Sequence, residues 1–158
     1  MNKTKSKNIF LIGLGNLGSN YLKAIFSFSF KINLFIHDKN TKLLDQKLIY
    51  PKNVKLFKVK NLNKFNKNID LAILATTAKK RLDLVKILKK SKVQTWILEK
   101  LIEQSVSSTN EIYENLKLDS CWVNIPRRAM SEYKYMRRNF QIYKPNYLKL
   151  SMNGDRIV

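Results

Sequence analysis

The chain has 158 residues, of which 44% are hydrophobic and 11% aromatic, so we expect one folded domain of ordinary size and exclude an intrinsically disordered chain. Its formal charge of +20, from 31 Lys and Arg against 11 Asp and Glu, is typical of nucleic-acid-binding proteins. However, Lys, Asn, Ile, Phe and Tyr are abundant together, which indicates that the positive charge arises from a general bias in amino-acid composition. Only six of the basic residues are Arg, the residue that recognises phosphates and bases best, so specific nucleic-acid binding is the less favoured interpretation.

The first predicted elements are a strand, a glycine-rich turn and a helix. Four apolar residues, 9–12, run into a G-x-G-x-x-G pattern, and a helix is predicted over residues 20–28. Gly13 would allow the tight turn, Gly15 would let the backbone approach a pyrophosphate, and Gly18 would let the helix pack closely. Phosphates would then bind at the helix N-terminus, where free N–H groups and the helix dipole favour negative charge. The predicted cofactor-binding residues here are Gly13, Gly15, Asn16, Leu17 and Gly18.

The second predicted strand covers residues 32–36 and is followed by Asp38, 20 positions after Gly18. An acidic residue at this spacing is expected to accept hydrogen bonds from the adenosine ribose, which favours NAD over NADP. Lys39 beside it leaves NADP open, because a cation could bind a 2′-phosphate. The alternative is that Asp38 is an ordinary strand-end or helix-capping residue. His37, the only histidine, is expected to pack or to touch the cofactor edge.

Strands and helices alternate through the rest of the chain. An edge strand is predicted over residues 53–59 and a central strand over residues 69–75. The run Lys79-Lys80-Arg81 is expected to begin a solvated helix through residue 90; the alternative is that it lies over cofactor phosphates. A strand over 95–98, a helix from a capping box at 108–111 to Leu116, and a strand over 121–123 follow. This alternation predicts an α/β fold, a doubly wound parallel sheet of the Rossmann type.

The expected compartment is the cytoplasm. No run of 18 apolar residues occurs in the sequence, and the basic residues at 1–7 lead into a strand instead of a signal-peptide core, so no membrane association is expected. The single Cys121 excludes an intramolecular disulfide and is expected to be a small buried residue of a strand. No metal site is predicted.

An ordered set of short segments resembles the Gfo/Idh/MocA oxidoreductases over residues 7–154. Around residues 122–128 the sequence is most similar to family members of polysaccharide biosynthesis, which act on nucleotide sugars or related sugars. The segments are 13–18, Asp38, 70–77, 98–100 and 124–128. The resemblance implies that Ala75, Thr76 and Thr77 border the cofactor, that Glu99 orients it, and that Lys100 is the catalytic residue, contacting the hydroxyl being oxidised. Asn124, Arg127 and Arg128 match the segment that returns towards a sugar or nucleotide-sugar substrate.

The chain departs from the family at several places. Leu101 stands where the family has proline after Glu-Lys, and residues 77–81 replace a Pro-x-x-x-His pattern. The family also implies a larger second domain. We therefore expect residues 1–124 to form the dinucleotide-binding domain, and residues 125–158 to be the crossing helix (131–139) and first strand (147–152) of a truncated α/β domain.

Two functions follow from that expected truncation. One is an NAD(P)-dependent oxidoreductase completed by another chain or by a homo-oligomer that pairs through strand 147–152. The other is a folded nucleotide-binding remnant without catalytic activity.

Overall fold

The computed structural model describes residues 6–116, 120–125, 130–131, 134–135 and 137–138. The chain separates into two units, Met1–Asn124 and Ile125–Val158, and the first of these carries the sheet and its helices. The predicted substrate residues Arg127 and Arg128 and the predicted strand 147–152 lie outside the described residues, and the expected crossing helix is described only in part. No helix among the described residues is long and apolar enough to cross a membrane.

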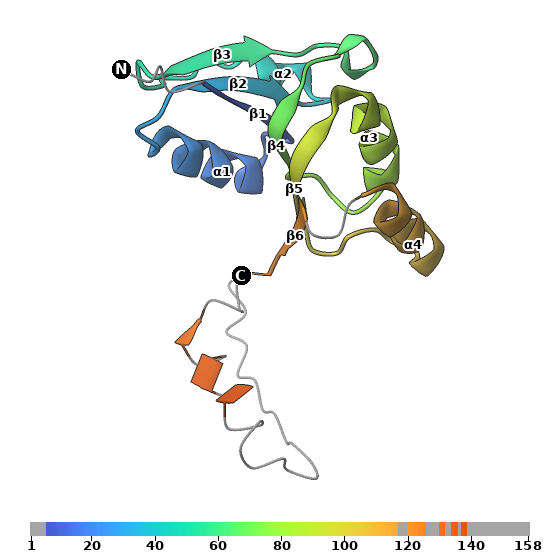
Figure 1. Cartoon of the computed structure of the whole chain (residues 1–158). Helices are drawn as coiled ribbons and strands as arrows, with labels where there is room; N and C mark the ends of the chain where they lie inside the picture. The colour runs from blue at the N-terminus through green and yellow to red at the C-terminus, as the bar shows by residue number, and fades with distance from the viewer. Residues whose placement is uncertain (1–5, 117–119, 126–129, 132–133, 136, 139–158) are drawn as a thin grey trace. The chain divides into compact units, whose positions relative to one another are not determined.

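Six parallel strands form one sheet in the order β3-β2-β1-β4-β5-β6 (Figure 1). The order reverses at β1, where successive strands are added first on one side and then on the other. This is the Rossmann-type order, so the predicted doubly wound α/β fold is confirmed. As expected, the third strand lies at an edge and the fourth lies in the centre. The strands are β1 Lys7–Ile12, β2 Ile32–His37, β3 Val54–Lys58, β4 Ile69–Leu74, β5 Val93–Glu99 and β6 Cys121–Asn124.

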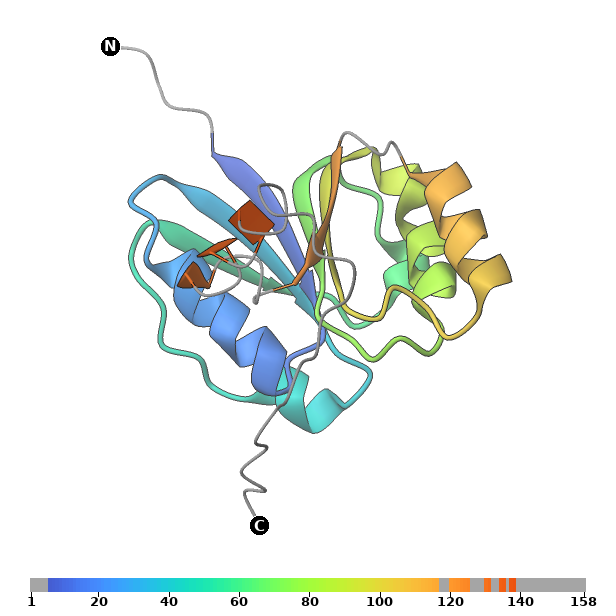
Figure 2. The same cartoon turned by 90° about the horizontal axis from the view of Figure 1, so that it is seen from below.

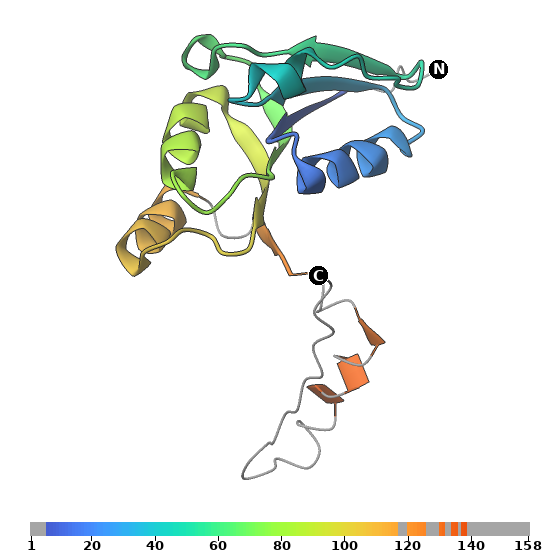
Figure 3. The same cartoon turned by 180° about the vertical axis from the view of Figure 1, so that it is seen from behind.

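Helices cover both faces of the sheet (Figures 2 and 3). Buried residues of α1 and α2 pack on one face, and those of α3 and α4 pack on the other. Two short 3-10 helices, η1 Leu62–Lys64 and η2 Lys89–Ser91, lie in the connections. The α-helices are α1 Asn16–Phe26, α2 Thr41–Asp45, α3 Arg81–Leu88 and α4 Val106–Asn115.

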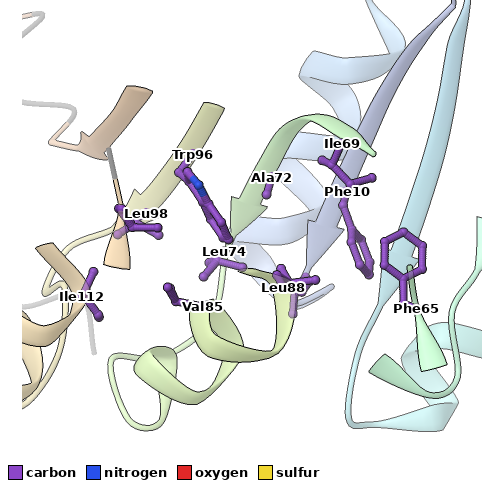
Figure 4. Close-up of a cluster of buried hydrophobic side chains, with 12 residues drawn as sticks. Phe10, Phe65, Ile69, Ala72, Leu74, Val85, Leu88, Trp96, Leu98 and Ile112 are labelled. Atoms are coloured by element: carbon purple, nitrogen blue, oxygen red, sulfur yellow. The ribbon is translucent and has the colours of Figure 1, made fainter. Parts of the chain in front are cut away.

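The buried half of β1 shows why the central strands contain runs of apolar residues. Phe10 and Ile12 belong to the hydrophobic core on the α3/α4 face, whereas Ile9 and Leu11 belong to the core on the α1/α2 face. Side chains of a strand alternate between its faces, so consecutive positions that are covered on both sides of the sheet are all apolar. Figure 4 shows the first of these cores, in which Phe10 and Phe65 lie with ring centroids 4.5 Å apart.

Several predicted boundaries were wrong. Helix α1 begins at Asn16, directly after the turn, because Gly15 itself is its N-cap. The short helix α2 was missed; the Asn40 side chain caps it by accepting a hydrogen bond from the Lys42 N–H at 3.1 Å. The N-cap of α4 is Ser105 and not Ser108, since the Ser105 hydroxyl accepts the Ser108 N–H at 3.0 Å.

Candidate functional site

The glycine turn connects β1 to α1, and its three glycines differ in what surrounds them. Gly13 has φ +95°, and a Cβ added there would lie 2.5 Å from the Ala75 carbonyl oxygen. At Gly18 an added Cβ would lie 2.0 Å from the Gly13 carbonyl oxygen. At Gly15 it would meet nothing within 4 Å. Gly13 and Gly18 are thus required by the fold itself, whereas within the described part of the chain no atom lies close enough to require glycine at position 15.

The first turn of α1 is open to a ligand. Among the described residues no side chain forms a capping hydrogen bond to this helix, and no acidic residue lies in its first turn, so the first N–H groups remain available to an anion. Asn16 and Leu17 form this turn and are exposed, with Leu17 48% exposed. Uncapped N–H groups at a helix start form an anion-binding arrangement.

Asp38 follows β2 and hydrogen-bonds to the backbone of the glycine turn. Its Oδ2 accepts a hydrogen bond from the Leu14 N–H, and its Oδ1 accepts one from the Asn40 N–H, both at 2.7 Å. The carboxylate therefore joins the glycine turn to the end of β2. Each carboxylate oxygen has two acceptor positions, so one position on each remains for a ligand hydroxyl. Asn40, and not Asp38, is the cap of the following helix.

A cavity of about 380 Å³ opens at the carboxyl ends of β1, β2 and β4. The structure brings four of the predicted cofactor residues together in its wall, along with the histidine and three lysines that flank them. The imidazole of His37 is held by its Nδ1, which lies 2.7 Å from the Val59 carbonyl oxygen; since a carbonyl only accepts, Nδ1 carries the proton. The residues named here are Gly13, Asp38, Thr76, Thr77, His37, Lys39, Lys79 and Lys80.

Arg81 contradicts its predicted place at a solvated helix start. Its side chain is fully buried, with 0% exposed. Its guanidinium donates hydrogen bonds to the backbone carbonyls of Thr76, Glu99, Leu101 and Ile102, including 2.5 Å to Glu99 and 2.9 Å to Ile102. Burial lowers the pKa of Arg81, and the nearby carboxylates of Glu103 and Glu99 oppose that shift.

This buried cation joins the segments after β4 and β5. One guanidinium group presents several donors in a fixed plane, which suits it to bridging carbonyls of two chain segments. Those two segments carry the predicted residues Thr76, Thr77, Glu99 and Lys100. The burial of Arg81 was not predicted because nothing in the local sequence distinguishes it from the two lysines before it. The available signal was that Arg81 stands where the Pro-x-x-x-His pattern of the family has its histidine.

A second cluster joins α1, β5 and β6. The Tyr21 hydroxyl donates to Glu99 Oε1 at 2.5 Å, and Asn124 Nδ2 lies 2.7 Å from the same oxygen and 2.8 Å from the Tyr21 hydroxyl. Glu99 is buried, with 3% exposed. The pKa of Tyr21 is raised, chiefly by burial and then by the neighbouring Glu99 carboxylate. The structure thus brings the predicted residues Glu99 and Asn124 together and adds Tyr21, which the sequence had marked only as part of a helix face.

Lys100 follows this cluster and is exposed, after the buried end of β5. The peptide bond between Lys100 and Leu101 is cis. None of the hydrogen bonds or ion pairs seen among the described residues involves the Lys100 side chain, so its ammonium group is free to meet a ligand. Ala75 lies against the glycine turn, donating its N–H to the Ile12 carbonyl oxygen at 2.8 Å.

No protein-family model matches the sequence, and no curated protein matches it. Solved structures do resemble its fold. Myo-inositol 2-dehydrogenase from Lactobacillus plantarum is 15% identical with a TM-score of 0.63, over 89% of this chain and 42% of that one. The WlbA dehydrogenase from Bordetella pertussis, in complex with NADH and UDP-GlcNAcA, is 15% identical with a TM-score of 0.67, over 88% and 40%.

Scyllo-inositol dehydrogenase from Lactobacillus casei, with bound NAD(H) and scyllo-inositol, is 16% identical with a TM-score of 0.60, over 89% and 42%. The chain shares the fold of these dehydrogenases. The resemblance to the Gfo/Idh/MocA oxidoreductases is thereby confirmed at the level of the fold. The chain spans about 40% of the length of the structures it matches.

Proposed function

We propose that residues 1–124 bind NAD as the cofactor domain of a Gfo/Idh/MocA-like oxidoreductase acting on a sugar-type hydroxyl. The observation that carries this proposal is the empty space around Gly15 beside the uncapped start of α1. A glycine that no neighbouring protein atom requires is accounted for by a ligand that approaches the backbone, and a pyrophosphate is the ligand that this turn suits. Two of the dehydrogenases that share the fold were crystallised with NADH or NAD(H), which supports the choice of cofactor.

The position of Asp38 supports NAD over NADP. A carboxylate at the end of β2 can accept hydrogen bonds from the ribose hydroxyls but repels a 2′-phosphate. Its two backbone hydrogen bonds fix its position before any ligand arrives. Lys39 and Lys79 in the same cavity wall reduce that repulsion, so we expect NADP to bind more weakly instead of being excluded.

The proposed chemistry places the reacting centre at the carboxyl end of β5. NAD, when bound, supplies the hydride acceptor. The ammonium group of Lys100 would contact the substrate hydroxyl and stabilise the negative charge that develops on its oxygen as the proton leaves. Asn124 would contact the substrate or its neighbouring groups, in keeping with its place beside Glu99. The sugar or nucleotide-sugar class rests on the relatives that share the fold.

Calorimetric titration with NADH, NADPH and ADP-ribose at two salt concentrations tests the cofactor assignment. With a net charge of +20, non-specific attraction of anions must weaken sharply as salt rises, whereas binding by directed hydrogen bonds persists. We expect salt-tolerant binding of NADH and ADP-ribose, with NADPH weaker. Binding that vanishes with salt would overturn the proposal and favour a folded remnant without cofactor function.

A further inference from the structure

Two loops at the amino ends of β2 and β3 present apolar side chains to solvent. Phe28 and Phe30, between α1 and β2, are 43% and 42% exposed and stack on each other with ring centroids 5.0 Å apart. Ile49 and Tyr50, in the loop before β3, are 92% and 44% exposed. We call these four residues the aromatic patch. Clusters of exposed apolar side chains mark surfaces that bind a partner or a membrane.

Hydrogen bonds and ring packing join the two loops of the aromatic patch. The Asn53 side-chain amide donates one hydrogen bond to the Phe28 carbonyl oxygen and one to the Phe30 carbonyl oxygen, each at 2.8 Å. The Tyr50 ring packs on Phe26 of α1, with ring centroids 6.4 Å apart. The patch is therefore ordered before any partner arrives, which reduces the entropy lost on docking.

The segments that supply the aromatic patch carry positive charge only. All 11 acidic residues of the chain lie outside segments 16–37 and 46–69. Lys31, Lys47 and Lys52 flank the patch in sequence, are exposed, and form no ion pair with a carboxylate among the described residues. Charge complementarity therefore indicates a partner that is anionic and also offers an apolar layer.

An anionic lipid membrane meets both requirements. Apolar and aromatic side chains enter the boundary between headgroups and acyl chains, while lysines meet the negatively charged headgroups. Single-stranded nucleic acid fits less well, because Ile49 has no ring face on which a base could stack, and Phe28 and Phe30 cover one face of each other. A second copy of the chain is disfavoured because it carries the same charge of +20.

We propose that the aromatic patch and its flanking lysines dock this domain on an anionic lipid membrane by partial insertion of the apolar side chains. This attachment lies on the membrane surface, so it needs no apolar run long enough to span a bilayer, and it replaces the expectation of no membrane association. The six residues of β2, about 20 Å, separate the patch from Asp38 and the cavity at the carboxyl ends. The inference therefore does not depend on the proposed cofactor function.

Tryptophan fluorescence tests the insertion directly. Ile49→Trp places the probe in the aromatic patch, and Val106→Trp, at a position of α4 that is 78% exposed, is the matched control. On phosphatidylcholine vesicles containing about one third phosphatidylserine, we expect the emission of Ile49→Trp, corrected for the unaltered chain, to shift to shorter wavelength, and that of Val106→Trp to stay unchanged. An unshifted Ile49→Trp emission in vesicle-bound protein would mean adsorption by net charge alone and would overturn the proposal.

Removing the two phenylalanine rings tests their contribution to the affinity. In Phe28→Ala/Phe30→Ala we expect binding to the same vesicles, measured by flotation, to weaken at least about tenfold. The control Val106→Ala/Tyr113→Ala, which removes exposed apolar side chains of α4, should bind as the unaltered chain does. Thermal unfolding checks that each variant is folded. If the phenylalanine variant bound vesicles normally but lost the binding of an oligothymidylate, the patch would bind single-stranded nucleic acid and the membrane proposal would be overturned.

A pair of charge-matched variants separates local docking from the general attraction of a basic protein. We expect Lys31→Gln/Lys52→Gln to weaken vesicle binding about tenfold. Lys42→Gln/Lys60→Gln removes the same charge beyond the carboxyl ends of β2 and β3, about 20 Å away, and should weaken it less than about threefold at about 0.15 M salt, where the Debye length is about 8 Å. Equal losses in the two variants would overturn the proposed orientation and the docking surface with it.

Discussion

Alanine at Gly15 should weaken dinucleotide binding at least about tenfold and leave the stability of the domain nearly unchanged. An added Cβ there meets no atom of the described residues within 4 Å, and the backbone φ of −65° suits any L-residue. Alanine is a poorer N-cap than glycine by roughly 0.5–1 kcal/mol, but it removes about 0.4–1 kcal/mol of unfolded-state entropy, so the two effects cancel to within about 0.5 kcal/mol. The methyl group instead occupies the approach to the pyrophosphate, and we expect the Kd for NADH to rise at least about tenfold.

The other two glycines of the turn provide the contrast. Gly18→Ala places Cβ 2.0 Å from a carbonyl oxygen of the turn, so helix and turn must separate by about 1 Å, at a cost on the order of 1–3 kcal/mol. Gly13→Ala combines a contact of 2.5 Å with φ +95°, which adds about 1–2 kcal/mol of backbone strain. For a domain of this size each variant should melt about 3–10 °C lower.

The assay pairs thermal unfolding with calorimetric titration of NADH and ADP-ribose for all three variants. We expect a binding defect without instability for Gly15→Ala, and instability for the other two. If Gly15→Ala bound both ligands as the unaltered chain does, the space beside Gly15 would have no connection with the ligand. If it melted as early as Gly18→Ala, the fold itself would require glycine at position 15.

Three further predictions concern other residues of the domain. The pKa of Tyr21 is raised in the folded state, so its contribution to stability is fully present below the unfolded-state pKa of about 10 and is lost as the pH rises further. Above pH 10 the unaltered chain should therefore lose up to about 1.4 kcal/mol of unfolding free energy per pH unit more than Tyr21→Phe. Urea unfolding of both proteins at pH 8, 10 and 11 measures the difference. Equal alkaline slopes would contradict the raised pKa. Arg81→Met removes the hydrogen-bond donor of four backbone carbonyls, at a cost of about 1–3 kcal/mol each, which together is comparable with the whole stability of a domain. We therefore expect this variant to show no cooperative melting transition, whereas the control Lys80→Met, at an exposed position, should melt normally. A normal transition in Arg81→Met would show that the carbonyls find other donors. Ser105→Ala should cost about 1 kcal/mol of unfolding free energy and Ser108→Ala only a few tenths, and the reverse order would restore the capping box at 108–111.

Local signals were sufficient for most of the sheet. A continuous apolar run predicted the central strand 9–12 and a near-continuous one the strand 69–75, because positions of a strand that are covered on both faces favour apolar side chains. The lysine-interrupted run at 53–59 correctly indicated an edge strand. Helix boundaries were less predictable: two serines three residues apart, Ser105 and Ser108, both suit an N-cap, and only the backbone geometry distinguishes them.

The residues of the candidate site also fall into two groups, those that the sequence could predict and those that it could not. The turn geometry of the glycines and the place of Asp38 at the end of β2 were predictable because they depend on spacing within one strand–helix–strand unit, and the family resemblance added Glu99, Lys100 and Asn124 as candidates. Two residues were not predictable. Arg81 bonds to backbone carbonyls up to 21 positions away, and Tyr21 meets Glu99 across 78 positions. Their partners are separated along the chain by whole strands and helices, so no local pattern marks them.

The sequence by itself determined the alternation of strands and helices, the parallel sheet and the phosphate turn, since these depend on periodicity and on glycine geometry within short segments. Only the tertiary structure decided which side chains share an environment. It buries the arginine of a basic run against backbone carbonyls at the ends of β4 and β5, and it pairs a tyrosine of the first helix with a glutamate of the fifth strand. It also leaves open space, among the described residues, at Gly15 but not at Gly13 or Gly18. Burial and pairing arise when elements remote in sequence pack together, and a polar side chain carries no mark of which partner will reach it.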